Sequence, residues 1–363
     1  CRRRHRFRHE RPVERARRRR ERLLAREQRE AGHAVDRLAG AQVRRLGRLV
    51  RQPEHVGRAA REGRASREGG LEERGTLRRV DAVVLGGGSL LQDSTSFRSL
   101  TYYAVLIIAA CLQRKPVLLW GQGLGPLRRR RSRLLVRGLL PLVTGACWRD
   151  PESAALATRL GREPRAADGQ GSDPVWGLPP QPWRGRGGAI VLAWRPTPLL
   201  QSPQWRQLLE ALDALVATSA REVIWLPFHA HQDRDLFSEL QRQGLLPDRL
   251  QQCSRQVECS TVQEAMAICS SAGLVLAMRL HALILGALSG APVAALSYDP
   301  KVAVAAAGLR CPCLPLGQPL PESAALAKSW QDALDRPPAS TSLMDLAADA
   351  ARHRRLFRPV EAA

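Results

Sequence analysis

The stretch Gly273–Val302, GLVLAMRLHALILGALSGAPVAALSYDPKV, decides the fold because it passes from a buried strand to a helix and back to a buried strand. Gly273–Ala277 is a short apolar run typical of a strand, and Leu280–Leu288 carries apolar residues at helical spacing. Val293–Leu296 predicts the second strand, after a glycine and a proline that stop the helix. A strand, a helix and a parallel strand form one right-handed crossover unit of an α/β sheet.

Charged residues follow both strands of this unit. Arg279 and His281 lie in the first turn of the predicted helix, and Lys301 follows the second strand. Ligands of open α/β sheets bind beyond the carboxyl ends of the strands, where backbone N–H groups and the helix dipole attract anions. Lys301 is one of only three lysines and comes directly after Tyr298-Asp299-Pro300, a turn signal. The pattern favours an anion site, although Arg and His at a helix start are also common as solvated or capping groups.

Upstream, three more predicted strands end in polar or glycine-rich loops. Gly86-Gly87-Gly88-Ser89 follows the predicted strand 81–85, a loop containing Gln122 and Gly123 follows the strand 116–120, and Arg149 follows the strand 143–148. Glycines let a backbone loop approach a ligand closely, and Ser89 can donate a hydrogen bond. A triple glycine alone is a weak signal, because it is neither the dinucleotide-binding fingerprint nor a P-loop.

The alternation of strands and helices continues through the second half of the chain. Predicted strands at 189–194 and 222–227 alternate with helices at 204–218, 233–243 and 261–269 before the opening unit is reached. We therefore predict an α/β fold of two Rossmann-like domains, with the carboxyl edges of both sheets on a shared cleft. The predicted domains are residues 78–176 and 189–335, joined by a Gly-, Pro- and Trp-rich linker at 177–188. Residues 336–363 supply a last helix, over Leu343–Phe357, that crosses back over the first domain.

Composition sets the broad class. The 363 residues are enough for two domains, and 44% of them are hydrophobic. The eight cysteines show no metal-ligand spacing, so we expect reduced thiols and no metal. The longest apolar run, 104–112, is about half the ~18 residues of a membrane span, and no signal-peptide pattern is present. These features predict a cytoplasmic enzyme.

The first 77 residues differ from the rest. The net charge is +23, but residues 1–80 hold 26 Arg, no Lys and 11 acidic residues, so most of the excess lies there. Few apolar positions recur with a helical or strand period, and such a segment does not easily offset its ordering entropy. Two other interpretations of this segment are a basic helix over 22–50 and an arm that binds nucleic acid. We expect no nucleic acid as partner, because no aromatic residues interleave with the arginines to stack on bases.

In their order, these motifs resemble those of a polysaccharide pyruvyl transferase, and most closely those of the bacterial enzymes that pyruvylate cell-wall polysaccharide. The resemblance covers residues 79–310 and rests on 84–93 (VLGGGSLLQD), 98–103 (RSLTYY), 121–126 (GQGLGP), Arg149-Asp150, Asp173-Pro174-Val175, 278–282 (MRLHA) and 297–302 (SYDPKV). It implies the two Rossmann-like domains of GT-B glycosyltransferases. It also implies transfer of pyruvate from phosphoenolpyruvate, as a co-substrate, onto two hydroxyls of a cell-surface polysaccharide precursor, forming a cyclic ketal.

That reaction assigns roles to the residues. Phosphoenolpyruvate carries a carboxylate and a phosphate close together, and guanidinium groups bind both bidentately. Arg149, Arg279 and Lys301 are therefore the expected donor-binding residues. His281 is the expected catalytic acid–base residue, and Asp93 orients a sugar hydroxyl or serves as a second base, although an ordinary loop carboxylate explains it equally well. No metal and no cofactor are expected. The acceptor is expected to be lipid-linked, with Arg128–Arg131 giving a peripheral contact at the inner face of the cytoplasmic membrane.

One other enzyme class stays open. A GT-B glycosyltransferase that uses a nucleotide-sugar donor needs the same architecture and the same cations at a helix start. The two differ in the leaving group, because only a pyruvyl transferase releases phosphate from phosphoenolpyruvate.

Members of the family usually begin with a strand and a glycine-rich loop of the type Asn-x-Gly-Asp-Glu, which residues 1–77 do not match. An Arg-rich, Lys-free, aperiodic segment is expected when GC-rich coding sequence is translated in the wrong frame. We therefore expect residues 1–75 to be a frameshift or a wrong start, to form no packed core and to leave the chain poorly active.

Overall fold

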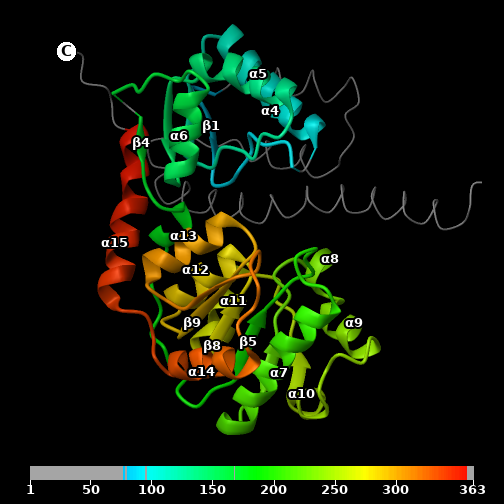
Figure 1. Ribbon diagram of the computed structural model, residues 1–363. Coiled ribbons are helices and arrows are strands. Elements are labelled where there is room, and N and C mark those ends of the chain that lie inside the picture. The colour runs from blue at the N-terminus through cyan, green and yellow to red at the C-terminus, as the bar shows by residue number, and fades with distance from the viewer. Residues whose placement is uncertain (1–76, 78–79, 95, 167, 358–363) are drawn as a thin grey trace, which may run out of the picture. The chain divides into compact units, whose positions relative to one another are not determined.

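The computed structural model describes residues 77, 80–94, 96–166 and 168–357. The predictions for residues 1–75 lie outside this part of the chain. The described part of the chain divides into two compact units, with the division between Asp168 and Gly169 (Figure 1). Each unit is described separately below.

The first unit is built on parallel strands in the order β1-β2-β3. Its elements are β1 (Val83–Gly86), α4 (Phe97–Leu112), β2 (Val117–Gln122), α5 (Arg130–Leu139), η1 (Leu140–Leu142), β3 (Gly145–Trp148) and α6 (Pro151–Arg159). Apolar residues of all three strands and of α4 and α5 form one core, because both helices bury one face and expose the other. Each strand is followed by one of the loops singled out from the sequence.

The second unit holds a six-stranded parallel sheet in the order β7-β6-β5-β8-β9-β10. Its strands are β5 (Ile190–Ala193), β6 (Val223–Trp225), β7 (Ser254–Gln256), β8 (Leu274–Ala277), β9 (Val293–Ser297) and β10 (Cys313–Pro315). Counted within the unit, this is the order 3-2-1-4-5-6 of a Rossmann fold, in which the winding direction reverses between the first and fourth strands. That switch point lies between β5 and β8.

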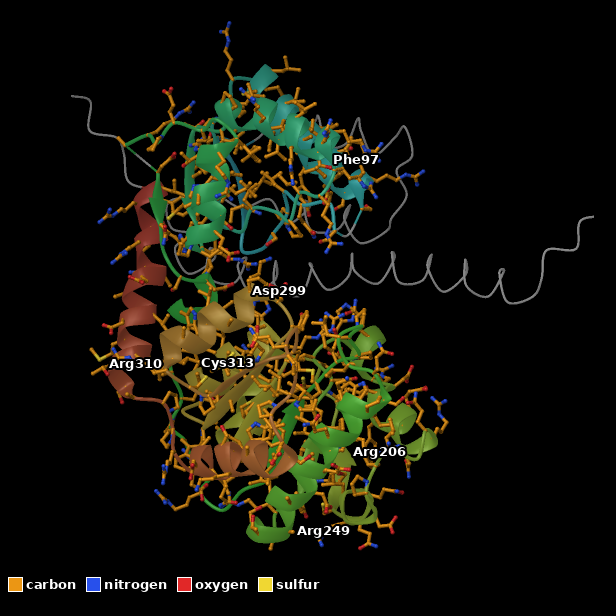
Figure 2. All side chains as sticks on the ribbon, viewed as in Figure 1. Phe97, Arg206, Arg249, Asp299, Arg310 and Cys313 are labelled. Carbon is orange, nitrogen blue, oxygen red and sulfur yellow. The ribbon has the colours of Figure 1, made fainter. Side chains whose placement is uncertain are left out.

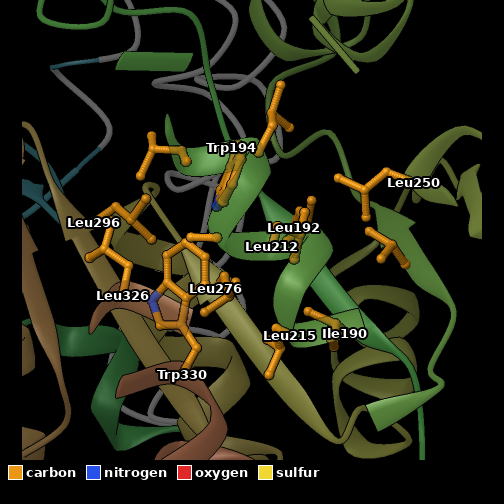
Figure 3. Close-up of a cluster of buried hydrophobic side chains, with 14 of the residues drawn as sticks. Ile190, Leu192, Trp194, Leu212, Leu215, Leu250, Leu276, Leu296, Leu326 and Trp330 are labelled. Atoms are coloured by element: carbon orange, nitrogen blue, oxygen red, sulfur yellow. The ribbon is translucent and has the colours of Figure 1, made fainter. Parts of the chain in front are cut away.

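Helices cover both faces of the six-stranded sheet (Figure 1). They are α7 (Ser202–Ser219), α8 (Ala230–Asp233), α9 (Leu236–Arg242), α10 (Asp248–Cys253), α11 (Val262–Ser270), α12 (Leu280–Leu288), α13 (Pro300–Leu309), α14 (Ser323–Ala333) and α15 (Ser340–Ala351). Side chains alternate along each strand, so Ile190 and Leu192 pack with α7 and α14, whereas Val191 and Ala193 pack with α11 and α12. Figure 3 shows the first of these two cores, in which Trp194 and Trp330 lie among leucines.

The remaining elements are β4 (Gly169–Gln170), η2 (Pro174–Gly177) and η3 (Arg352–Phe357). Val175 and Trp176 of η2 are buried in the core of the second unit, and α15 packs against η2 and α13. For this reason the division of the chain falls before Gly169, earlier than the linker that composition indicates at 177–188. The predicted terminal helix 343–357 is α15 followed by η3.

The α/β class with parallel sheets is confirmed. The predicted opening unit is found as β8, α12 and β9, and α12 has the predicted bounds. The structure differs from the local predictions in two ways. The helix expected at 233–243 is two helices, α8 and α9. Among the elements that were not predicted are β7, α10, β10, α14 and α13, and the last of these contains Lys301. The missed strands have only three residues each, too few for a period to show.

Candidate active site

The carboxyl edge of the second sheet carries the densest set of predicted site residues. Arg279 is the N-cap of α12, directly after β8, and His281 is the second residue of that helix. Lys301 is the second residue of α13, after β9, and its backbone N–H donates to the Asp299 carboxylate at 2.9 Å. All three therefore lie at the starts of two neighbouring helices, where the helix dipoles favour an anion.

Arg279 is held by an acidic partner. Its Nε donates to Asp233 Oδ2 at 3.0 Å, and its Nη2 donates to Asp233 Oδ1 and, at 2.9 Å, to Gln232 Oε1. The Asp233 side chain is 1% exposed and that of Arg279 is 16% exposed. Asp233 also accepts the backbone N–H of His229 at 2.9 Å, so the short helix α8 is fixed to the start of α12. These bonds use Nε and Nη2 of Arg279.

A second arginine lies at the switch point itself. Arg195 follows β5, and its backbone N–H donates to Met278 Sδ at 3.5 Å. Its Nη1 donates to Tyr298 Oη at 3.2 Å, and its guanidinium lies 4.8 Å from the centre of the Tyr298 ring. Because Met278 precedes Arg279 and Tyr298 lies just before α13, Arg195 links the loops after β5, β8 and β9. The structure thus brings a second guanidinium, and a third cation, to the edge that carries Arg279 and Lys301.

The first unit has a smaller constellation at its own carboxyl edge. Arg149, after β3, donates from Nη2 to Ser89 Oγ at 3.0 Å. Gly123 lies beneath this contact, since a Cβ added there would lie 2.4 Å from Ser89 Oγ and 2.9 Å from Arg149 Nε. Ser89, Gly123 and Arg149 are therefore brought together as predicted, and a glycine is required at 123.

The glycines after β1 have local roles. A Cβ at Gly86 would lie 2.4 Å from the carbonyl oxygen of Trp120, so the close approach of β1 to β2 requires glycine. Gly87 has φ +77°, which turns the chain after β1. Strand packing therefore explains the glycine at position 86, and the turn explains the glycine at position 87. Neither explanation involves a ligand. Gly88 follows in the same loop, and its carbonyl oxygen accepts from the N–H of Gly123 at 2.8 Å.

Gln122, at the end of β2, is fully buried. Its Nε2 donates to the carbonyl oxygen of Gly123 at 3.1 Å. Its Oε1 has no hydrogen-bond partner in the described part of the chain. A buried acceptor without a partner costs about 1–3 kcal/mol, so a hydroxyl or water that donates to Gln122 would be favoured here.

Asp93 has a structural role. Its two carboxylate oxygens accept the backbone N–H groups of Arg128 and Arg129 at 2.9 and 2.8 Å, just before α5 begins. Burial raises the pKa of Asp93, but these hydrogen bonds outweigh that effect and leave the pKa below its usual value. A carboxylate with a lowered pKa is a weak base, so these contacts favour positioning of the loop over proton transfer. A catalytic role for Asp93 stays a prediction.

Arg195, Asp233 and Tyr298 were not assigned roles from the sequence. Arg195 follows a predicted strand in the same way as Arg279 does, so the same rule identifies it. Asp233 carries no such signal, because it contacts Arg279 across 46 positions of sequence. Among the described residues, no group of three or more His, Cys, Asp or Glu residues could hold a metal ion. In the same part of the chain, no helix has the length and apolar character needed to span a bilayer.

Comparison with known proteins gives the fold and the family. No curated protein sequence matches the chain. Among solved structures, the UDP-GlcNAc 2-epimerase from Methanocaldococcus jannaschii matches with a TM-score of 0.58 and 12% identity, covering 81% of this chain and 83% of that one. The UDP-N-acetylglucosamine 2-epimerase from Rickettsia bellii matches with a TM-score of 0.51 and 12% identity, covering 85% and 81%. At such identities the likeness concerns the fold alone.

The model of the family "Polysaccharide pyruvyl transferase" matches residues 3–300. The matched range includes both carboxyl edges described above and ends one residue before Lys301. It also begins within the basic amino-terminal segment. That residues 1–75 are a frameshift or a wrong start stays a prediction. The chain therefore belongs to the polysaccharide pyruvyl transferase family.

Proposed function

We propose that this protein transfers pyruvate from phosphoenolpyruvate to two hydroxyls of a saccharide that is a precursor of cell-surface polysaccharide. The observation that carries the proposal is the group of Arg195, Arg279 and Lys301 at the carboxyl edge of the second sheet. Phosphoenolpyruvate has a carboxylate and a phosphate on the same carbon, so it needs several fixed cations. Two guanidinium groups, one ammonium and the starts of α12 and α13 supply them at one edge.

The expected chemistry delivers one proton to carbon and removes one proton from each of the two attacking hydroxyls. A proton adds to the methylene carbon while a sugar hydroxyl adds to the neighbouring carbon and gives up its proton, and phosphate then leaves with the electrons of the C–O bond. The second hydroxyl attacks the resulting oxocarbenium centre and closes the ketal, and its proton leaves with the released phosphate. His281 begins α12 beside Arg279, where it can transfer a proton near neutral pH.

Arg149 and Ser89 in the first unit are proposed to bind an anionic or hydroxyl group of a substrate. Their contact at 3.0 Å holds the guanidinium in place, where it can bind a carboxylate or a phosphate, as expected for Arg149 from the sequence.

The test is incubation of the purified chain with phosphoenolpyruvate and candidate saccharides. We expect phosphate release that depends on the saccharide, together with a product heavier by pyruvate less one water. A parallel incubation with UDP-sugars covers the glycosyltransferase alternative. Release of UDP with glycosylated product, and no phosphate from phosphoenolpyruvate, would overturn the proposal.

A further inference from the structure

Helix α4 exposes a row of apolar side chains to solvent. The exposed fractions are 42% for Tyr102, 54% for Val105, 41% for Ile108 and 81% for Leu112. These residues are three to four positions apart, so they share one side of the helix. The opposite side is buried, with Leu100, Ala104, Ile107 and Ala110 in the core. An apolar row on the outer side of a surface helix indicates an interaction site.

Helix α5 continues this surface. The strand order β1-β2-β3 and right-handed connections place α4 and α5 on the same face of the sheet, and the two helices lie side by side (Figure 1). The Arg131 guanidinium lies 4.1 Å from the centre of the Phe97 ring. At the other end of α4, Cys111 Sγ donates to the carbonyl oxygen of Leu142 at 3.5 Å. The outer sides of the two helices therefore form one continuous surface.

The charged residues of the two helices have a single sign. Helix α4 contains Arg98, and α5 contains Arg130, Arg131, Arg133 and Arg137, whereas neither helix contains Asp or Glu. On α5, Arg130 and Arg137 flank Leu134 at helical spacing, and Leu134 is 68% exposed. Apolar side chains flanked by arginines are the arrangement by which a helix lies in the interface of an anionic bilayer.

We propose that the outer sides of α4 and α5, termed the α4–α5 surface, dock the protein on a membrane that contains anionic phospholipid. The arginines contact the headgroups, and Val105, Ile108 and Leu112 enter the boundary between headgroups and acyl chains. A second copy of the chain would match the apolar row but would oppose like charges. Nucleic acid would match the arginines but not the apolar row. The proposal concerns binding and does not depend on the reaction at the candidate active site.

The test is flotation of the full-length chain with vesicles of phosphatidylcholine, with and without phosphatidylglycerol. Residues 1–80 are also basic, so low-salt binding does not by itself report on the α4–α5 surface. Binding is therefore measured at about 0.1 M and about 1 M salt, between which the Debye length falls from ~10 to ~3 Å. The diagnostic quantity is the binding that persists at high salt, because apolar insertion is not screened.

The main variant is Val105→Gln/Ile108→Gln/Leu112→Gln, which keeps or improves helix propensity at exposed positions. We expect salt-resistant binding to fall by tenfold or more, because three apolar side chains no longer move from water into the membrane. The matched control is Val304→Gln/Met344→Gln, which changes exposed apolar residues of α13 and α15 and is expected to bind as wild type. Arg130→Gln/Arg137→Gln should weaken low-salt binding to anionic vesicles by about fivefold per residue.

Three results would overturn the proposal. The first is wild-type protein that does not bind phosphatidylglycerol vesicles. The second is salt-resistant binding that is unchanged in the triple Gln variant. The third is a wild-type dimer in solution that the triple variant converts to a monomer, since a second copy would then cover the α4–α5 surface.

Discussion

Two arginine–aspartate pairs of the second unit have the same chemistry and lie at opposite edges of one sheet. At the carboxyl edge Asp233 binds Arg279, which follows β8. At the amino edge Asp335 binds Arg221 at 2.6 Å, and the backbone N–H of Asp335 donates to Gly273, just before β8. Each aspartate uses both oxygens on its arginine. Residue type and the use of both carboxylate oxygens therefore do not distinguish the two pairs.

Their surroundings do distinguish them. Arg221 also donates to the carbonyl oxygen of Gly188, and Asp335 accepts the N–H of Gly187, so this pair ties the chain entering β5 to the sheet. Arg279 instead lies at the start of a helix that carries His281, near Arg195 and Lys301. In a parallel sheet the carboxyl edge receives ligands and the amino edge does not. Position in the sheet, rather than the chemistry of the pair, therefore indicates that the Asp233–Arg279 pair belongs to the candidate site and that the Asp335–Arg221 pair stabilises the fold.

The largest effect is expected at His281. His281→Ala should lower turnover by about 10²–10⁴-fold, because general acid–base groups contribute on that scale, with little change in melting temperature. The matched control is His353→Gln. His353 is fully buried and its Nε2 lies 2.7 Å from the carbonyl oxygen of Ser172, so its replacement should lower stability and leave turnover per folded molecule unchanged. Equal turnover in wild type and His281→Ala would remove His281 from the mechanism.

The two ion pairs can be tested directly against each other. Asp233→Asn should weaken phosphoenolpyruvate binding by about tenfold, because a neutral amide no longer holds the Arg279 fork in place. Asp335→Asn breaks a pair of the same kind and should lower stability by up to about 3 kcal/mol while donor affinity stays as in wild type. Calorimetric titration and thermal melting of both variants give the comparison. Tighter donor binding in Asp233→Asn would show that Asp233 only neutralises Arg279.

The sequence predicts the local architecture of this site well and its long-range contacts poorly. Helix α12 and the placement of Arg279 and His281 follow from apolar spacing and from the parallel α/β rule, both of which are local. The roles of Asp93 and Asp233 depend on partners 35 and 46 positions away, which periodicity does not encode. The sequence places Lys301 directly after a turn signal, Tyr298-Asp299-Pro300, and no helix was predicted there. In the structure Asp299 is the N-cap of α13 and Pro300 is its first residue. Asp followed by Pro is common both in turns and at helix starts, so the sequence alone does not distinguish the two.

A smaller effect on substrate binding is expected from a substitution at the carboxyl edge of the first sheet. Gly123→Ala would place a methyl group 2.4 Å from Ser89 Oγ and 2.9 Å from Arg149 Nε. We expect Arg149 to be displaced and substrate affinity to fall severalfold, with a smaller change in turnover. Gly138→Ala is the control, since nothing lies within 4 Å of its added Cβ. Alanine there, inside α5, should stabilise the protein by about 1 kcal/mol. Steady-state kinetics in which Gly123→Ala matches wild type would exclude the Ser89–Arg149 contact from substrate binding.

The smallest effect concerns pH and a packed histidine of the second unit. Burial lowers the pKa of His353 below its usual value of 6.5, while its bond to Ser172 and the nearby acids oppose that shift in part. The folded state therefore binds fewer protons than the unfolded state as pH falls below about 6.5. Stability should decrease with falling pH in that range, by at most about 1.4 kcal/mol per pH unit for this one group, until the folded-state pKa is reached.

Urea unfolding at several pH values between about 7.5 and about 5 measures this slope, with His353→Gln as the variant that lacks the group. The difference in free energy of unfolding between wild type and variant should change with pH in the stated direction, because other titrating groups are common to both. A pH slope that persists unchanged in His353→Gln would assign the effect to other groups and leave His353 as a packing residue only.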